Sequence, residues 1–457
     1  MTRVDELQKK YPNVPREVIV KLDALTLGIR DSDAFDNIGH WARSGGVGTY
    51  QSYDRELPRL ETRPGYVKRL GAFQMKNGLG ARIERDSTSP YEIRELDSGQ
   101  FALFEGEEKV QDIYFPQKPW PFAEQKEPLT SSGTPVTSLV NLKAPHCFGI
   151  TPVRHCEYFS LGEQCKFCNY DATQEGARTA GAIRAITVKL DEVVEAYKIL
   201  SSNVRLLEGL FQMGAFKDAD KEASLHLDFV ERVAKEAPYK PVFTANCQPM
   251  SRKNMQRLKD AGLDCVIMNI EVWDRHLFEE ICPGKTKRDG YDWYLEALVE
   301  AVDVFGAGNV ATAFVGGATM IPDNGHRTWQ EARDSTAEGV EWAIKNGMMT
   351  IYTSLRLGPG SVYGDDKSKN LAKLAPTEFY LDLSVGHHES AKKHGLYQHL
   401  NKLMFCPMDC LDNHYAGELG IVELAGDPGK WLSDTIPDKA NWLSQFVASL
   451  ESPAKVQ

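Results

Sequence analysis

The sequence predicts an α/β fold built on a parallel sheet, because short apolar runs alternate with helical segments from about residue 140 onward. The chain has 457 residues, of which 42% are apolar and 10% aromatic, enough to bury a large core. Strand–helix–strand connections are right-handed and give parallel neighbours, which close into a barrel or stay open as a doubly wound sheet. The six runs expected as buried strands are Phe148–Val153, Val204–Met213, Pro241–Ala245, Cys265–Val272, Asn309–Val315 and Thr350–Leu355.

The segments between these runs carry helix signals. Apolar residues from Leu190 to Leu200 follow a period of 3.6 residues. Ser251 is placed to cap a helix that ends before Gly262. Thr328 and Glu331 have the spacing of a capping box. Strand and helix signals therefore agree on the alternation.

The region before the sheet has a different pattern. A helix is expected near Pro15, and alternating residues in 91–115 predict a small antiparallel meander. A proline-rich stretch from Pro116 to Pro135 then predicts an extended linker. We therefore expect an N-terminal α+β extension over 1–139, the central domain over 140–385 and a C-terminal helical and loop extension over 386–457.

The composition disfavours several classes of function. A net charge of −11 gives no general attraction to nucleic acid, and no apolar run is long enough to span a membrane. The charged start of the chain and nine unevenly distributed cysteines predict a cytoplasmic protein. His387 and His388 show no ligand spacing and are expected at solvated positions.

Three cysteines after the first predicted strand are the main functional signal. The run HCEYFSLGEQCKFC contains Cys156, Cys165 and Cys168, and Phe167 precedes the last of them. Three thiolates can hold a 4Fe-4S cluster and leave one iron free to bind a small molecule. The alternative is a zinc site in which His155 or Cys147 supplies a fourth ligand.

With these residues the chain resembles the radical S-adenosylmethionine (radical SAM) superfamily, whose members hold a 4Fe-4S cluster on three cysteines, usually with an aromatic residue before the third. The spacing between Cys156 and Cys165 is eight residues, where the family usually has three. The resemblance implies a partial barrel of six β/α units with the cluster loop after its first strand. The dinucleotide-binding glycine loop of an open sheet is not found after that strand.

The resemblance also suggests cofactor-binding positions at the C-terminal ends of the strands. Glu271 corresponds to a carboxylate that contacts the ribose or amino group of SAM, and Gly214 to a turn near its amino group. Gly316 and Gly317 correspond to a strand end that lets adenine approach the backbone. Arg356 is a candidate for a carboxylate of SAM or substrate. For each position a structural role in a turn, at a strand end or on the surface is the alternative.

The activity implied by the resemblance is reductive cleavage of SAM to a 5′-deoxyadenosyl radical, which abstracts hydrogen from a small-molecule or peptide substrate. The electron would come from an external flavodoxin or ferredoxin, and the protein would be oxygen-sensitive. Cys406 and Cys410 are candidates for an auxiliary cluster, although two thiols are too few alone. The competing function is a zinc-stabilised interaction protein.

Overall fold

The structure is a computed structural model that describes residues 1–30, 32, 72–75, 80–83, 86–114, 128–144, 147–179, 185–203, 206, 208–239 and 241–396. Its strands are β1 (Ala72–Gln74), β2 (Gly80–Arg82), β3 (Tyr91–Glu95), β4 (Phe101–Glu105), β5 (Glu108–Ile113), β6 (Val140–Ala144), β7 (Cys147–Ile150), β8 (Glu208–Gln212), β9 (Val242–Asn246), β10 (Cys265–Ile267), β11 (Val310–Gly316) and β12 (Met349–Ser354). Its longer helices are α1 (Arg3–Lys10), α2 (Arg16–Leu27), α7 (Tyr170–Thr179), α8 (Leu190–Asn203), α9 (Ala219–Glu236), α10 (Arg252–Asp260), α13 (Tyr291–Phe305), α14 (Trp329–Lys345) and α17 (Thr377–Lys393). The shorter ones include α5 (Val136–Leu139), α6 (Glu157–Ser160), α11 (Arg275–Ile281), α12 (Pro283–Arg288) and α15 (Val362–Asp365).

The central sheet has the order β12-β11-β10-β9-β8-β7-β6. Strands β7 to β12 are parallel to their neighbours, and β6 pairs antiparallel with β7. Each parallel strand is adjacent to the next one along the chain, so the strand order never reverses. Right-handed crossovers then place the connecting helices on one face of the sheet, as in a barrel.

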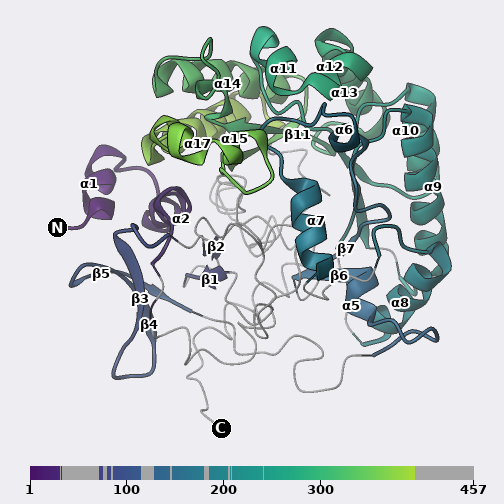
Figure 1. Ribbon diagram of the computed structural model, residues 1–457, viewed down its shortest axis with the longest axis horizontal. Coiled ribbons are helices and arrows are strands. Elements are labelled where there is room, and N and C mark those ends of the chain that lie inside the picture. The colour runs from purple at the N-terminus through teal and green to yellow at the C-terminus, as the bar shows by residue number, and fades with distance from the viewer. Residues whose placement is uncertain are drawn as a thin grey trace.

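Figure 1 shows this winding: α8, α9, α10, α13 and α14 follow one another around the outside, and α7 stands nearer the middle of the view. Three buried aromatic rings pack together on the first parallel strands: Phe148 on β7, Phe211 on β8 and Phe243 on β9 contact one another edge to face. The predicted partial barrel of six β/α units is therefore confirmed.

Each of the six predicted runs overlaps one parallel strand, but the fourth is shorter than expected. The run Cys265–Val272 is regular only as far as Ile267, and pairing resumes at an isolated bridge between Glu271 and Phe314. Strand β6 was not predicted. It pairs antiparallel with β7, so that β6 and not the first parallel strand forms this edge of the sheet.

The N-terminal region contains the predicted three-stranded antiparallel meander β3-β4-β5. It shares a second hydrophobic core with α1, α2 and α17, whose members include Val4, Ile19, Tyr91 and Phe379. Helix α17 also packs on α14 of the barrel. The meander and the first two helices are thus joined to the end of the barrel through α17.

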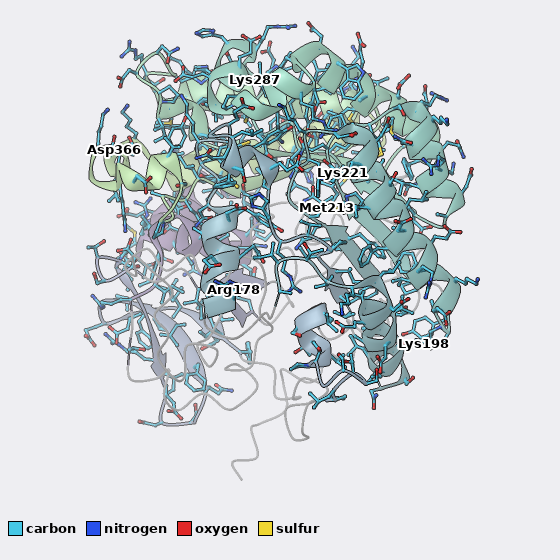
Figure 2. The ribbon with its side chains drawn as sticks, turned by 45° about the vertical axis from the view of Figure 1, so that its right-hand side comes forward. Arg178, Lys198, Met213, Lys221, Lys287 and Asp366 are labelled. Atoms are coloured by element: carbon cyan, nitrogen blue, oxygen red, sulfur yellow. The ribbon has the colours of Figure 1, made fainter. Side chains whose placement is uncertain are left out.

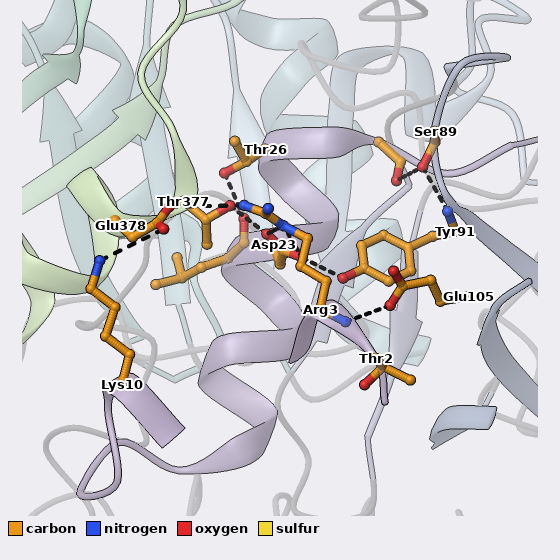
Figure 3. A network of polar contacts seen from close by, with 12 residues as sticks. Thr2, Arg3, Lys10, Asp23, Thr26, Ser89, Tyr91, Glu105, Thr377 and Glu378 are labelled. Carbon is orange, nitrogen blue, oxygen red and sulfur yellow. Dashed lines mark hydrogen bonds and ion pairs between the residues drawn. The ribbon is translucent and has the colours of Figure 1, made fainter. Parts of the chain in front are cut away.

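A buried carboxylate connects these elements. Asp23 on α2 is fully buried and accepts hydrogen bonds from Tyr91 on β3 and Thr377 on α17. Arg3 Nε donates to both its oxygens, at 3.0 and 3.1 Å. Figure 3 shows these partners converging on Asp23 from three other elements. One charge in a dry site therefore ties together segments that are far apart in the sequence.

Of the remaining expectations, the one on His387 is wrong, and those on Cys406, Cys410 and the domain boundaries stay predictions. Cys406 and Cys410 lie outside the described residues, and the two boundaries between the three domains stay predictions. His387 is not solvated: it is 2% exposed and its Nε2 lies 3.3 Å from Thr350 Oγ1. Among the described residues, no helix has the length and apolar character needed to cross a bilayer.

Replacing Asp23 with alanine should lower the free energy of unfolding by about 2–4 kcal/mol, because Arg3, Tyr91 and Thr377 would lose their shared acceptor. Urea denaturation measures the change. Glu107→Ala on the meander, where the carboxylate is 92% exposed, is the control and should have little effect. Equal stability of Asp23→Ala and Glu107→Ala would show that the network does not stabilise the fold.

Candidate functional site

The three cysteines lie on one loop between β7 and α7, at the C-terminal end of the sheet. Cys156 caps the short helix α6, and a turn in which Cys168 N–H donates to Cys165 O at 2.9 Å holds the other two together. All three side chains are half-buried. The structure thus places the predicted ligands where the C-terminal ends of the barrel strands meet.

The pKa values indicate that the three thiols are neighbours. Burial raises the pKa of Cys156 to about 12, and Cys165 contributes to this increase. Burial, Cys165 and Cys156 raise the pKa of Cys168 well above its ordinary value. Cys165 differs: a hydrogen bond with Cys282 lowers its pKa, as does the charge of Lys285, against the effect of burial.

Asp171, at the start of α7, fixes the entrance to this loop. Its Oδ1 accepts from Cys156 N–H at 3.0 Å, and its Oδ2 lies 2.6 Å from His155 Nδ1. Ser160 Oγ lies 3.0 Å from the other ring nitrogen of His155. Both nitrogens of His155 are therefore engaged, and the residue acts as a support for the loop. No spacing in the sequence pointed to Asp171.

Two glycines allow other loops to approach the cysteine loop closely. A Cβ on Gly214, just after β8, would lie 2.0 Å from His155 O. A Cβ on Gly284, in α12, would lie 2.6 Å from the Tyr158 ring and 2.7 Å from Glu163 O. Gly214 therefore has a packing reason to be glycine, and its role toward the amino group of SAM stays a prediction.

The junction of α11 and α12 is bonded to the cysteine loop through the backbone. Lys166 N–H donates to Ile281 O and Gly284 N–H donates to Glu163 O, both at 2.9 Å. Tyr363 N–H, on α15 after β12, donates to Lys166 O at 2.9 Å. The loops that follow β8, β10 and β12 thus all contact the cysteine loop.

Glu271 lies at a β-bulge beside this loop. Three residues separate Ile267 from Glu271, whereas two separate their partners Ala311 and Phe314 on β11. The extra residue places Glu271 at a φ of 68°, which is unfavourable for a residue with a side chain. Two backbone bonds hold it there, to Ala313 O at 2.8 Å and from Val315 N at 2.9 Å.

Glu271 lies near the thiols, because its charge raises the pKa of both Cys165 and Cys168. Its contact with SAM stays a prediction. Its carboxylate is paired within the protein: Lys285 Nζ lies 2.9 Å from Glu271 Oε1. The same ammonium donates to Asn269 O at 2.5 Å and lies 3.4 Å from Tyr294 OH. The sequence analysis did not single out Lys285.

A second buried ion pair lies at the other end of α12. Arg288 NH1 is 3.2 Å from Glu222 Oε2, and the two oxygens of Glu222 also accept from Phe216 N and Gln248 N. Gln248 and Asn269 each lie two residues after the end of a strand, β9 and β10 respectively. Their side-chain amide oxygens are buried and have no hydrogen-bond partner among the described residues. Such acceptors are suited to a polar ligand, since an unpaired buried oxygen is costly.

The other predicted residues are more dispersed. Phe167 packs on the main core, and Arg356 is half-buried just beyond β12. A Cβ on Gly316 would lie 2.6 Å from the Tyr380 ring, and one on Gly317 would lie 2.9 Å from Ala375 Cβ. The space beside Gly316 is occupied by side chains of α17, and that beside Gly317 by Ala375 just before this helix, so packing accounts for the lack of side chains. Their role toward adenine stays a prediction.

These contacts test which metal group the thiols fit. Among the described residues, no three His, Cys, Asp or Glu side chains are arranged to hold a single metal ion. His155 is occupied by Asp171 and Ser160, so it is not placed to complete a zinc site. In a 4Fe-4S cluster each thiolate binds a different iron, so neighbouring sulfurs need not converge on one point. The residues fit the cluster, and the zinc alternative receives no support.

A barrel wound in one sense with a three-cysteine loop after its first parallel strand is the arrangement that the resemblance to the radical SAM superfamily implied. The chain is 27% identical over 198 residues to a bacteriochlorophyllide c C-7(1)-hydroxylase from Chlorobaculum limnaeum. This match covers 40% of the chain and 49% of the relative, so the chain spans about half the length of the curated relative it matches. The resemblance predicted from the cysteines is confirmed, and the cofactors of this class are a 4Fe-4S cluster and SAM.

No family model matches the chain. Among solved structures, it is similar to a methylornithine synthase at 13% identity and a TM-score of 0.34, over 57% of this chain and 70% of that one. A hydrogenase maturase from Carboxydothermus hydrogenoformans gives 13% identity and the same TM-score of 0.34, over 66% and 76%. The description of the fold depends on the strand order and not on these likenesses.

Replacing Cys156, Cys165 or Cys168 with alanine should each prevent stable assembly of a 4Fe-4S cluster, because each removes one of the three thiolates. Iron and sulfide are quantified after anaerobic reconstitution. Cys247→Ala, a buried cysteine outside the loop, is the control and should load fully. Full cluster content in any of the three loop variants would contradict the ligand assignment.

Proposed function

We propose that this protein is a radical SAM enzyme that cleaves SAM reductively and abstracts hydrogen from a small organic substrate. The observation that carries the proposal is the position of three neighbouring thiols beside Glu271, at the C-terminal end of a barrel. That end of a barrel is where loops from successive strands assemble an active site. When bound, the cluster and SAM supply the electron transfer and the radical that the side chains of a protein cannot provide.

The residues of the chain have the tasks of holding, orienting and shielding. Cys156, Cys165 and Cys168 would hold the cluster, and Asp171 fixes the loop on which they lie. Glu271 would accept hydrogen bonds from the ribose or amino group of SAM through the oxygen that remains beside its contact with Lys285. Arg356 would bind a carboxylate of the cofactor or the substrate.

The unpaired amide oxygens of Gln248 and Asn269 support a ligand that carries hydrogen-bond donors. The acidic chain has no general attraction to nucleic acid, which agrees with a small organic substrate. The name of the relative describes hydroxylation of a bacteriochlorophyllide, and about half of that protein is matched. An external one-electron donor of the flavodoxin or ferredoxin type completes the proposal.

Glu271→Gln should weaken SAM binding by about 1–3 kcal/mol without preventing cluster assembly, because the amide keeps the shape and loses the charged hydrogen bond. Titration of SAM into the reconstituted variant measures the loss. Glu280→Gln is a matched control, since Glu280 is also paired with a lysine near the loop, at 2.9 Å from Lys166. Unchanged affinity in Glu271→Gln would assign Glu271 a purely structural role.

Reductive cleavage can be tested before the substrate is known. Anaerobic, reconstituted protein mixed with SAM and a strong one-electron reductant should form 5′-deoxyadenosine and methionine, which chromatography of quenched reactions detects. Cys168→Ala should lose this activity together with the cluster, whereas Cys247→Ala should retain both. If the fully loaded protein binds SAM but forms no more 5′-deoxyadenosine than Cys168→Ala, the proposed function is wrong.

A further inference from the structure

Lys285 is buried beside the cysteine loop, and the proposed function assigns it no role in binding SAM. The backbone bonds from Lys166 to Ile281 and from Gly284 to Glu163 fix α12 against that loop. The missing side chain of Gly284 allows this approach. Lys285 follows Gly284 directly. Cys282 lies three positions before Lys285, and its thiol contacts that of Cys165. The geometry therefore brings one ammonium group close to one of the three proposed ligands.

The charge of Lys285 is held in place and kept from water. Its side chain is 4% exposed, and Nζ is bonded to Glu271 Oε1 and Asn269 O. Burial by itself lowers the pKa of Lys285, but Glu271 together with Tyr294, Cys165 and Cys282 outweighs this effect, so its pKa lies well above the ordinary value. At Cys165 the charge of Lys285 has a larger effect on the pKa than that of Glu271.

A buried ion pair is a poor source of stability, because apolar residues of similar volume often serve the fold as well. Its retention beside a redox centre calls for another explanation. Reduction adds one negative charge to a cluster, and its potential depends on nearby charge and on exposure to solvent. A fixed cation in a site with little water stabilises the reduced state most.

We propose that Lys285 tunes the redox potential of the centre formed by Cys156, Cys165 and Cys168, with its buried ammonium beside Cys165 making the bound cluster easier to reduce. This inference rests on the proposed function, because it requires a cluster on these thiols. Lys285 acts through the electric field at the cluster and through the position of Glu271, and it does not itself contact the reacting atoms.

The test is a potentiometric titration of the anaerobically reconstituted protein without SAM, followed by the electron paramagnetic resonance signal of the reduced cluster. Lys285→Met should reduce the equilibrium constant for one-electron reduction about tenfold, a shift of about 59 mV to more negative potential. Lys285→Arg keeps the charge and should stay close to the unaltered protein.

Lys287 provides the matched control on the same helix. Its Nζ is also paired with a carboxylate, that of Glu163 at 2.5 Å, but its side chain is 64% exposed. Figure 2 shows Lys287 at the outer surface of the molecule. Solvent and salt should screen its charge, so Lys287→Met should leave the potential almost unchanged.

A second pair of variants covers the case in which Glu271, left without Lys285, takes up a proton and masks the lost charge. The potential of the double variant E271Q/K285M is compared with that of E271Q alone, where no carboxylate remains. The double variant should again lie lower by about tenfold in the equilibrium constant.

Several outcomes would overturn the inference. Equal potentials within both pairs, at full cluster loading, would show that the charge of Lys285 does not reach the cluster. Failure of both neutral variants to load while Lys285→Arg loads would assign Lys285 to cluster assembly and not to its potential. Failure of the unaltered protein to assemble any cluster would instead refute the proposed function.

Discussion

The candidate site depends on the close approach of three loops to the segment that carries Cys156, Cys165 and Cys168. That segment contains little regular structure, and only the four residues of α6 are helical between Cys156 and Cys168. Its shape is set from outside, by backbone bonds from the α11–α12 junction and α15 and by the carboxylate of Asp171. Side chains larger than hydrogen at Gly214 and Gly284 would push these loops apart.

The buried charges of the site follow from the same arrangement. Helix α12 has six residues and carries two cations into the protein, Lys285 toward Glu271 and Arg288 toward Glu222. Both acidic residues are also fixed near a strand end. The backbone of Glu271 is bonded to β11 at the bulge, and the carboxylate of Glu222 accepts from the amides of Phe216 and Gln248. Breaking such a pair would leave an uncompensated charge, which makes the end of the barrel rigid around the cysteines.

The N-terminal region is held by a separate carboxylate, Asp23, which binds residues of α1, β3 and α17. Because α17 also packs on α14, the meander and the outer helices of the barrel share one support. The first turns of α17 and the residue Ala375 before it also fill the space beside Gly316 and Gly317. The packing of the N-terminal region and the shape of the last strand ends are therefore linked through α17.

The sequence by itself determined the alternation of strands and helices, the meander and the three-cysteine loop, because these signals lie in neighbouring residues and depend on local periodicity, turn chemistry and spacing. It also indicated Glu271 as a candidate site residue, since a polar residue at the end of an apolar run is expected at the C-terminal edge of a parallel sheet. Only the tertiary structure decided that Lys285 pairs with Glu271, that Asp171 occupies His155, and that Tyr380 and Ala375 lie beside the two glycines. Each of these contacts joins different elements and is created by the packing of loops and helices, so no pattern along the chain could reveal it.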